Sequence, residues 1–357
     1  MITMLLITAI FLLINGILYV RVWLGRWPWE RGLPLLTLGF AIASFGLSPM
    51  AYAVTPAPEG GYPCGNTAEG DDALFSLTTG SRIGINNTAA GWQALYFNTT
   101  GNDNTATGLA ALHSNIDGSA NTATGLQSLY GNTSGNFNTA DGYNALSNNT
   151  TGSDNTANGA NVLYNNTAGN SNTASGNYSL SSNLTGNDNA AYGNYALFSN
   201  GAGSENTATG FNSLYSNTTG SNNVANGVSS LIQNSTGNFN TANGNSALYG
   251  NASGDNNTAN GSFALANNTT GINNTASGAS SLAFNTIGSD NIALGFSAGA
   301  NLTTGSNNID IGNAGVADEA KLSASEAQEL TRLLLSPALV ELLLLTRYRW
   351  SSTGMVN

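Results

Sequence analysis

An Asn-x-x-x-Gly motif recurs every 17 residues, without a slip, from Asn87 to Gly312, which gives fourteen copies. A further copy, Asn66 to Gly70, precedes them and lies four residues out of phase. So short a fixed period is typical of a solenoid, in which one structural unit stacks on itself. Repeats of two helices need more than about 30 residues. The sequence therefore predicts an all-β parallel β-solenoid, a β-roll or β-helix of about fifteen 17-residue coils.

The columns of the repeat indicate which side chains face the core. With the Asn counted as position 1, the Ala at position 3 and the Leu at position 9 are expected to face inward. The Thr at position 2 and the polar residues at position 4 are expected to face outward. Each coil is expected to contain two short strands and two turns. The repeat columns are represented in two successive coils by Asn104, Gly108, Leu112, Asn115, Gly118, Asn121, Gly125, Leu129, Asn132 and Gly135.

Glycine and asparagine occupy the columns where turns are expected. Gly recurs at positions 5 and 15, and we expect it at corners because only Gly adopts a positive φ without cost. Asn recurs at positions 1 and 12, and it tolerates the left-handed region in turns. Stacked coils would place each Asn over the next one, so the side-chain amides are expected to form ladders.

Charge and composition exclude several classes of protein. Only 8% of the residues are charged, and the formal net charge is −11. Between Asn87 and Gly315 there is no Lys or Arg, against nine acidic residues, so the basic track that a nucleic-acid-binding protein needs is missing. A disordered low-complexity chain would not require Leu and Gly at fixed columns.

Chemistry-bearing residues are few. Cys64 and His113 are the only cysteine and the only histidine, which excludes an intrachain disulfide, a His-based triad and a His metal cluster. The acidic residues at position 17 could hold Ca²⁺ between coils, but most members of that column are not acidic, and solvated turn carboxylates explain them better. We therefore predict no enzyme activity, no cofactor and no metal site.

Residues 1–53 read as a hydrophobic leader. The apolar stretches Ile2–Trp23 and Leu33–Leu47 are separated by arginines and followed by Ala51-Tyr52-Ala53. Basic region, apolar region and Ala-x-Ala predict a signal peptide cleaved after Ala53, with membrane contact through this segment before cleavage. The length of this leader has two explanations: translation begins downstream of Met1, which we favour because the cleavage site lies beyond both stretches, or the first stretch, which is long enough to span a bilayer, is a membrane helix. Residues 54–65 are interpreted as a linker or N-terminal cap, and 66–316 as the solenoid.

Residues 317–357 are predicted to form a helical tail. Ser323-x-x-Glu326 matches a capping box, and Ser336-Pro337 is typical of a helix start. The leucine run Leu342–Leu345 is too short to span a membrane. The alternatives are a hydrophobic lid on the last coil, a contact between subunits, or a truncated or frameshifted gene end.

Position 10 carries a broken column of aromatic residues. Its members are Tyr96, Tyr130, Tyr164, Phe198, Tyr215 and Tyr249, and they form a candidate interaction stripe. Packing between strands or between subunits is the first interpretation, and a carbohydrate- or partner-binding stripe is the alternative. Each coil contributes one Leu and at most a few exposed aromatics, which is little apolar area for a lone chain. We therefore predict that several chains share a core, as a homotrimer.

The columns resemble the YadA-like head repeats of trimeric autotransporter adhesins. Asn104 to Gly108 reads Asn-Thr-Ala-Thr-Gly, and Asn291 to Gly295 reads Asn-Ile-Ala-Leu-Gly. The 17-residue form is also similar to repeat arrays of bacterial surface and tail-fibre-like proteins. The resemblance implies a left-handed parallel β-roll and a trimer. The residues after Asp318 depart from it, because they show neither the heptads of a stalk nor the alternating strands of a barrel anchor.

These patterns predict a non-enzymatic extracellular rod that mediates attachment to a host, matrix, carbohydrate or cell-surface ligand. Its expected location is outside the cell, or on the surface or outer membrane of a bacterium. One alternative is a phage-type tail-fibre or receptor-binding shaft without its C-terminal chaperone domain. Another is an ice-binding solenoid, indicated by Thr-Ala-Thr at 105–107, 122–124 and 207–209.

Overall fold

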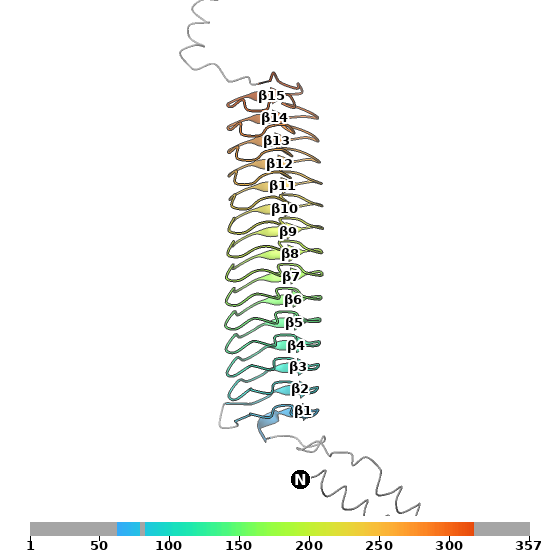
Figure 1. Ribbon diagram of the computed structural model, residues 1–357, viewed down its shortest axis with the longest axis vertical. Helices are drawn as coiled ribbons and strands as arrows, with labels where there is room; N and C mark the ends of the chain where they lie inside the picture. The colour runs from blue at the N-terminus through green and yellow to red at the C-terminus, as the bar shows by residue number, and fades with distance from the viewer. Residues whose placement is uncertain (1–62, 79–82, 318–357) are drawn as a thin grey trace, which may run out of the picture. The chain divides into compact units, whose positions relative to one another are not determined.

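The computed structural model describes residues 63–78 and 83–317, which form one parallel β-solenoid (Figure 1). The described part begins with a short 3-10 helix, η2 (Pro63–Gly65), and continues as a 15-stranded sheet whose strand order is the chain order. The predicted fold class is confirmed. The leader with Ala53 and the predicted C-terminal helices lie outside the described residues. The strands are β1 (Thr67–Glu69), β2 (Thr88–Ala90), β3 (Thr105–Thr107), β4 (Thr122–Thr124), β5 (Thr139–Asp141), β6 (Thr156–Asn158), β7 (Thr173–Ser175), β8 (Ala190–Tyr192), β9 (Thr207–Thr209), β10 (Val224–Asn226), β11 (Thr241–Asn243), β12 (Thr258–Asn260), β13 (Thr275–Ser277), β14 (Ile292–Leu294) and β15 (Ile309–Ile311).

Neighbouring strands pair in parallel and in register, so each repeat column becomes a straight row along the axis. Thr105 pairs with Thr122, and Ala106 pairs with Ala123. The first coil keeps this register although it is longer, because Thr67 pairs with Thr88 across 21 residues. The extra four residues of that coil therefore lie outside the strand, as the out-of-phase first motif indicated.

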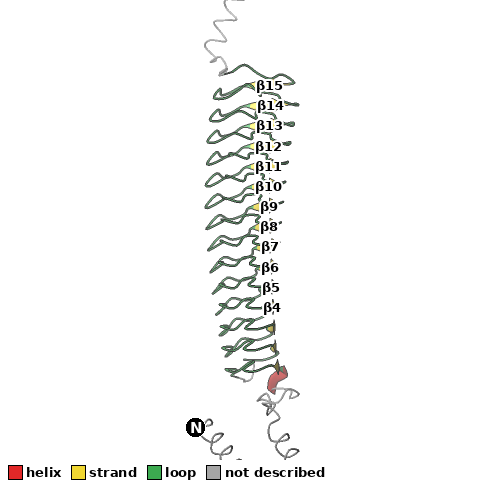
Figure 2. Cartoon of the chain, turned by 45° about the vertical axis from the view of Figure 1, so that its right-hand side comes forward, coloured by secondary structure: helices red, strands yellow, loops and turns green. Residues whose placement is uncertain are grey.

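Each coil contains one strand rather than the two that we expected. Figure 2 shows the strands along one side of the solenoid and loops around the rest of each coil. These loops are nevertheless hydrogen-bonded from coil to coil. Leu214 N–H donates to Ser230 O at 2.9 Å, and Asn222 N–H donates to Ser204 O at 3.0 Å. The expectation of a second strand was wrong because positions 7 and 9 have positive φ, which is incompatible with an extended strand.

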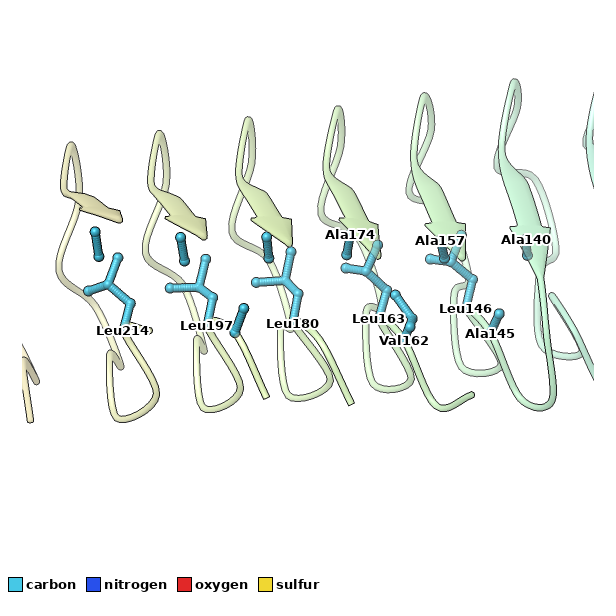
Figure 3. Packing of buried hydrophobic residues seen from close by; sticks show 14 of the residues in the cluster. Ala140, Ala145, Leu146, Ala157, Val162, Leu163, Ala174, Leu180, Leu197 and Leu214 are labelled. Carbon is cyan, nitrogen blue, oxygen red and sulfur yellow. The ribbon is translucent and has the colours of Figure 1, made fainter. Parts of the chain in front are cut away.

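The core consists of two facing rows of side chains. The strand alanines at position 3 are buried, and the leucines at position 9 from Leu95 to Leu282 are fully buried. Figure 3 shows the leucine row, including Leu146 and Leu163, facing the alanine row. Small residues at position 8, such as Ala111 and Ser128, are also buried and leave room for these leucines. The predicted inward direction of the alanine and leucine columns is confirmed.

The leucines adopt an unusual backbone conformation. Leu112 and Leu129 both have a φ of 50°, in the left-handed region. That region costs a non-glycine residue about 1–2 kcal/mol. Complete burial of a leucine side chain contributes about 1.5–3 kcal/mol, which offsets the strain. The sequence pattern predicted that the position 9 leucine is buried, but it did not predict the left-handed backbone conformation of that leucine.

Candidate functional site

The asparagines at position 1 form a continuous buried ladder, as predicted. Asn104 Nδ2–H donates to Asn87 Oδ1 at 3.1 Å and to Gly118 O at 2.8 Å, and its backbone N–H donates to Asn87 Oδ1 at 3.0 Å. Asn121 repeats the pattern one coil later, with Gly135 O as the carbonyl acceptor. These asparagines are fully buried, so each amide must find its partners inside the protein.

The asparagines at position 12 form a second ladder. Asn115 Nδ2–H donates to Asn98 Oδ1 at 2.7 Å and to Gly118 O at 2.8 Å. Asn132 makes the equivalent bonds to Asn115 and to Gly135 O. The glycine carbonyl at position 15 therefore accepts from both ladders and joins them. Neither asparagine column has positive φ, so the expectation that they are left-handed turn residues was wrong.

The two glycine columns serve different purposes. Gly108 and Gly125 at position 5 have φ values of 136° and 122°, as expected. At position 15 the glycine does not have a positive φ, and the lack of space for a side chain is what requires glycine. A Cβ on Gly118 would meet Gly135 O at 2.5 Å and Asn132 Nδ2 at 2.8 Å. The predicted positive φ at position 15 was wrong, and the reason for glycine there is the close approach of the neighbouring coil.

A third ladder, at position 16, was missed by the sequence analysis. In most coils the N–H of the residue there donates to the side-chain oxygen of its counterpart in the next coil, and the bond is missing where that counterpart is Ile272. Asn102 donates to Ser119 Oγ at 3.0 Å, and Ser119 donates to Asn136 Oδ1 at 2.8 Å. The pattern is visible in the sequence, because this column is Ser or Asn in all coils except those with Ile85, Asp255 and Ile272. Ser and Asn both offer a short side-chain acceptor.

The strand face is mostly polar from β1 to β13. Thr105 and Thr107 on β3, and Thr122 and Thr124 on β4, are exposed on either side of a buried alanine. Each of the strands β1 to β7 begins with a threonine, and the outward side chains of β1 and β5 include the carboxylates of Glu69 and Asp141. The predicted outward direction of positions 2 and 4 is confirmed, so from β1 to β13 this face presents mainly hydroxyl and amide groups in successive coils.

The position 10 aromatics form two separate clusters. In the first, Phe75, Tyr96, His113 and Tyr130 stack with successive centroid distances of 5.1, 5.4 and 4.9 Å. In the second, Phe198 stacks on Tyr215 at 5.1 Å. Tyr164 and Tyr249 have no aromatic neighbour in their column, because serine or aliphatic residues fill it in the adjacent coils. Stacked rings cover one another's faces, so the first cluster offers mainly ring edges to a partner.

Exposed apolar residues at position 6 run beside the first cluster. In the second cluster Phe211, at position 6, contacts Tyr195, and Tyr195 contacts Tyr215, so positions 6 and 10 belong to one side of the solenoid. In the second to fifth coils position 6 is occupied by large apolar side chains, which are 40–51% exposed. We call the following residues together the apolar face: Phe75, Trp92, Tyr96, Leu109, His113, Leu126, Tyr130 and Tyr143.

His113 is the one residue of the apolar face that titrates near neutral pH. Its ring lies between Tyr96 and Tyr130, and burial lowers the pKa of His113 below its ordinary value of 6.5. The unfolded chain then binds the proton more tightly than the folded one. The contribution of neutral His113 to the free energy of unfolding is therefore fully present above pH 6.5. It is lost as the pH decreases through 6.5 towards the lower pKa of the folded state.

We expect this effect to disappear in His113→Tyr, which restores the commoner residue of the column. Urea unfolding at pH 7.5 and pH 5.5 measures it. The wild type should lose stability at pH 5.5, while the variant should change much less, because carboxylates titrate near pH 4. Equal pH dependence of the two proteins would contradict the assignment.

Two of the acidic residues at position 17 accept side-chain hydrogen bonds from the preceding coil. Asn86 Nδ2–H donates to Asp103 Oδ1 at 3.0 Å, and Asn273 Nδ2–H donates to Asp290 Oδ1 at 3.0 Å. Within residues 63–78 and 83–317, no group of three or more His, Cys, Asp or Glu side chains is placed to hold a metal ion. In the same part of the chain, no helix has the length and apolar character needed to cross a bilayer.

Comparisons with known proteins give no family. No protein-family model matches the chain, and no curated protein matches it in sequence. What can be argued about function therefore depends on the repeat columns and the surfaces that they form.

Proposed function

We propose that this protein is a non-enzymatic rod, exported to the surface of a bacterial cell, with a structural and adhesive role. The observation that carries the proposal is the uninterrupted solenoid, in which one strand follows another from β1 to β15. At about 4.8 Å per rung, fifteen coils extend over roughly 70 Å. Buried hydrogen-bonded ladders along the whole length give a stiff shaft, which suits holding a surface away from the cell.

The apolar face supports self-association into a homotrimer. In the second to fifth coils, positions 6 and 10 carry no acidic residue, whereas the chain has a net charge of −11 that would repel a second copy elsewhere. Adjacent exposed side chains such as Trp92 and Leu109 form a contiguous patch rather than scattered single residues. Contiguous apolar patches of this kind mark association surfaces in soluble proteins. Pooling these patches would also enlarge the small core of each chain.

The double variant Leu109→Asp, Leu126→Asp should abolish the trimer. It places two carboxylates in the centre of the proposed interface, where unpaired buried charges cost several kcal/mol. We expect sedimentation velocity of the exported protein to give the mass of three chains for the wild type. The double variant should sediment as a monomer, with a dissociation constant raised at least about a hundredfold.

The matched control is Thr105→Asp, Thr122→Asp, which adds the same charges to the same two coils on the strand face. It should remain trimeric with unchanged circular dichroism. A monomeric wild type at micromolar concentration, or equal dissociation of both variants, would contradict the proposal.

Adhesion is assigned to the strand face, because its polar groups recur in the successive coils from β1 to β13 and allow many weak contacts at once. Cells that export the chain should attach to a host-cell or matrix layer more strongly than cells that lack it. Thr105→Asp, Thr122→Asp should lower this attachment several-fold while leaving the oligomer intact. If attachment does not depend on the chain, the adhesive role is wrong even where the rod and trimer are correct.

A further inference from the structure

The exposed columns of the sheet change character in the last two strands. Up to β13 they are mostly threonine and small polar residues, as in Thr275 and Ser277. In β14 and β15 they become Ile292, Leu294, Ile309 and Ile311, which are 45, 51, 60 and 66% exposed. Phe296, just after β14, is 80% exposed. We call the four outward residues of β14 and β15 the end patch.

The buried columns change at the same place. Asp310 replaces the strand alanine and is buried, and Leu302 replaces the asparagine of the position 12 ladder. As a result, Asn285 Oδ1 has no hydrogen-bond partner, although its predecessors in the ladder accept from the next asparagine. An inward carboxylate and an interrupted ladder disfavour the stacking of another coil. The last coil therefore has the features of a terminal coil. A second copy stacked end to end on it would not continue the alanine row or the position 12 ladder.

Ile292 pairs with Ile309, and Leu294 pairs with Ile311, so the end patch is a contiguous apolar surface on the outward side of the last two strands. An exposed patch of this kind marks a surface that binds another segment or partner. The chain itself supplies such a segment close by. Residues 318–357 follow the last coil, and ten leucines lie between Leu322 and Leu345. Ala317, the last described residue, is six residues from Ile311, so the chain beyond it starts within about 22 Å of the end patch. A tethered segment has an effective concentration in the millimolar range, far above that of a free partner.

We propose that the segment Leu322–Leu345 binds to the end patch of its own chain and covers the outward face of the last two strands. The leucines of the segment cover the isoleucines of β14 and β15. The proposal also gives a reason for the change from threonine to isoleucine, which the solenoid alone does not require.

Hydrogen exchange of the full chain tests the proposal. In Ile292→Thr, Ile309→Thr, the end patch regains the threonine column of the rest of the sheet, with a β-branched side chain retained. Amides of residues 322–345 should be protected in the wild type and should exchange at least about tenfold faster in this variant. Val224→Thr makes the same change in the same column at β10 and should leave the segment unaffected. Amides of β14 and β15, followed in the same experiment, show whether the last coil is still folded.

Deletion of residues 319–357 is the second variant. It should expose the end patch and increase binding of an anilinonaphthalene dye several-fold, and the two threonine substitutions should reverse that increase. Absent protection of the segment in the wild type would overturn the proposal, as would protection that the end-patch variant leaves unchanged. Protection that depends on protein concentration would also overturn it, because the cover would then come from a second copy.

Discussion

Asn223→Asp should destabilise the solenoid more than any conservative exchange at its surface. Asn223 Nδ2–H donates to Asn206 Oδ1 at 3.1 Å and to Gly237 O at 2.8 Å, and its own Oδ1 accepts from Asn240. Aspartate has the same shape but no N–H, so two buried acceptors lose their donor and face a carboxylate. Each such loss costs about 1–3 kcal/mol, and the total is about 3–5 kcal/mol. Because coils contact only their neighbours, the melting curve should also split into two transitions.

The control lies three residues away. Asn226 belongs to an exposed ladder on the strand face, where its Nδ2–H donates to Asn243 Oδ1 at 2.9 Å. Asn226→Asp keeps the carboxylate in water, and surface substitutions usually change stability by no more than about 0.5 kcal/mol. Thermal and urea unfolding followed by circular dichroism compares the two variants. Lowering the pH should recover part of the Asn223→Asp loss, because burial raises the pKa of the new carboxyl and the folded form then takes up a proton. An equal loss of unfolding free energy in both variants would mean that the buried ladder contributes no more to stability than the exposed one.

Gly203→Ala should be comparably damaging, for a reason that is steric rather than conformational. An added Cβ would lie against Gly220 O, 2.5 Å from Asn200 Oδ1 and 2.7 Å from Asn217 Nδ2. These atoms belong to the neighbouring coil and to the position 12 ladder, so they cannot move without breaking hydrogen bonds. Gly203 O also accepts from Asn189 and Asn200, which ties the two ladders together at this point. We expect a loss of at least about 3 kcal/mol, at the upper end of overpacking effects.

Gly201→Ala is the matched control within the same coil. The nearest atom to a Cβ on Gly201 is Thr218 O at 3.3 Å, and other coils place threonine in that column. The substitution should be neutral, or stabilising by about 0.4–1 kcal/mol through the unfolded chain. Urea midpoints of the two single variants measure the difference. If Gly203→Ala has the same urea midpoint as the wild type, the contact between coils at position 15 is looser than described.

The repeat period was sufficient to predict the fold, because a column pattern without insertions admits only stacking in register. It also placed Ala106 and Leu112 in the core and Asn104 in a ladder. It did not give the number of strands per coil, since leucine at a left-handed φ contradicts its ordinary preference. The reason predicted for Gly118, a positive φ, was wrong. Glycine is required there because the adjacent coil crowds the position, and a single repeat does not show that contact.

The surfaces were harder to predict than the core. Position 10 was found as an aromatic column, but position 6 was not, because its members from Trp92 to Tyr143 share only bulk and apolar character. The position 16 ladder mixes Ser and Asn, so it is visible only when side chains are compared by the acceptor that they offer. The end patch could not be predicted from the sequence, because only the three-dimensional arrangement shows which face of the last strands is left uncovered.

In-register stacking also determines how a gene for such a shaft can change. Removal or duplication of one 17-residue unit leaves every remaining pair of coils with the same partners, and alters the reach of the shaft by about 4.8 Å. Any other change of length within the array must be accommodated in a loop, as the four extra residues of the first coil are, or it moves an asparagine out of its row. Recombination between near-identical repeats changes a gene in whole units, so it adjusts the span of this protein in equal steps while preserving its interior.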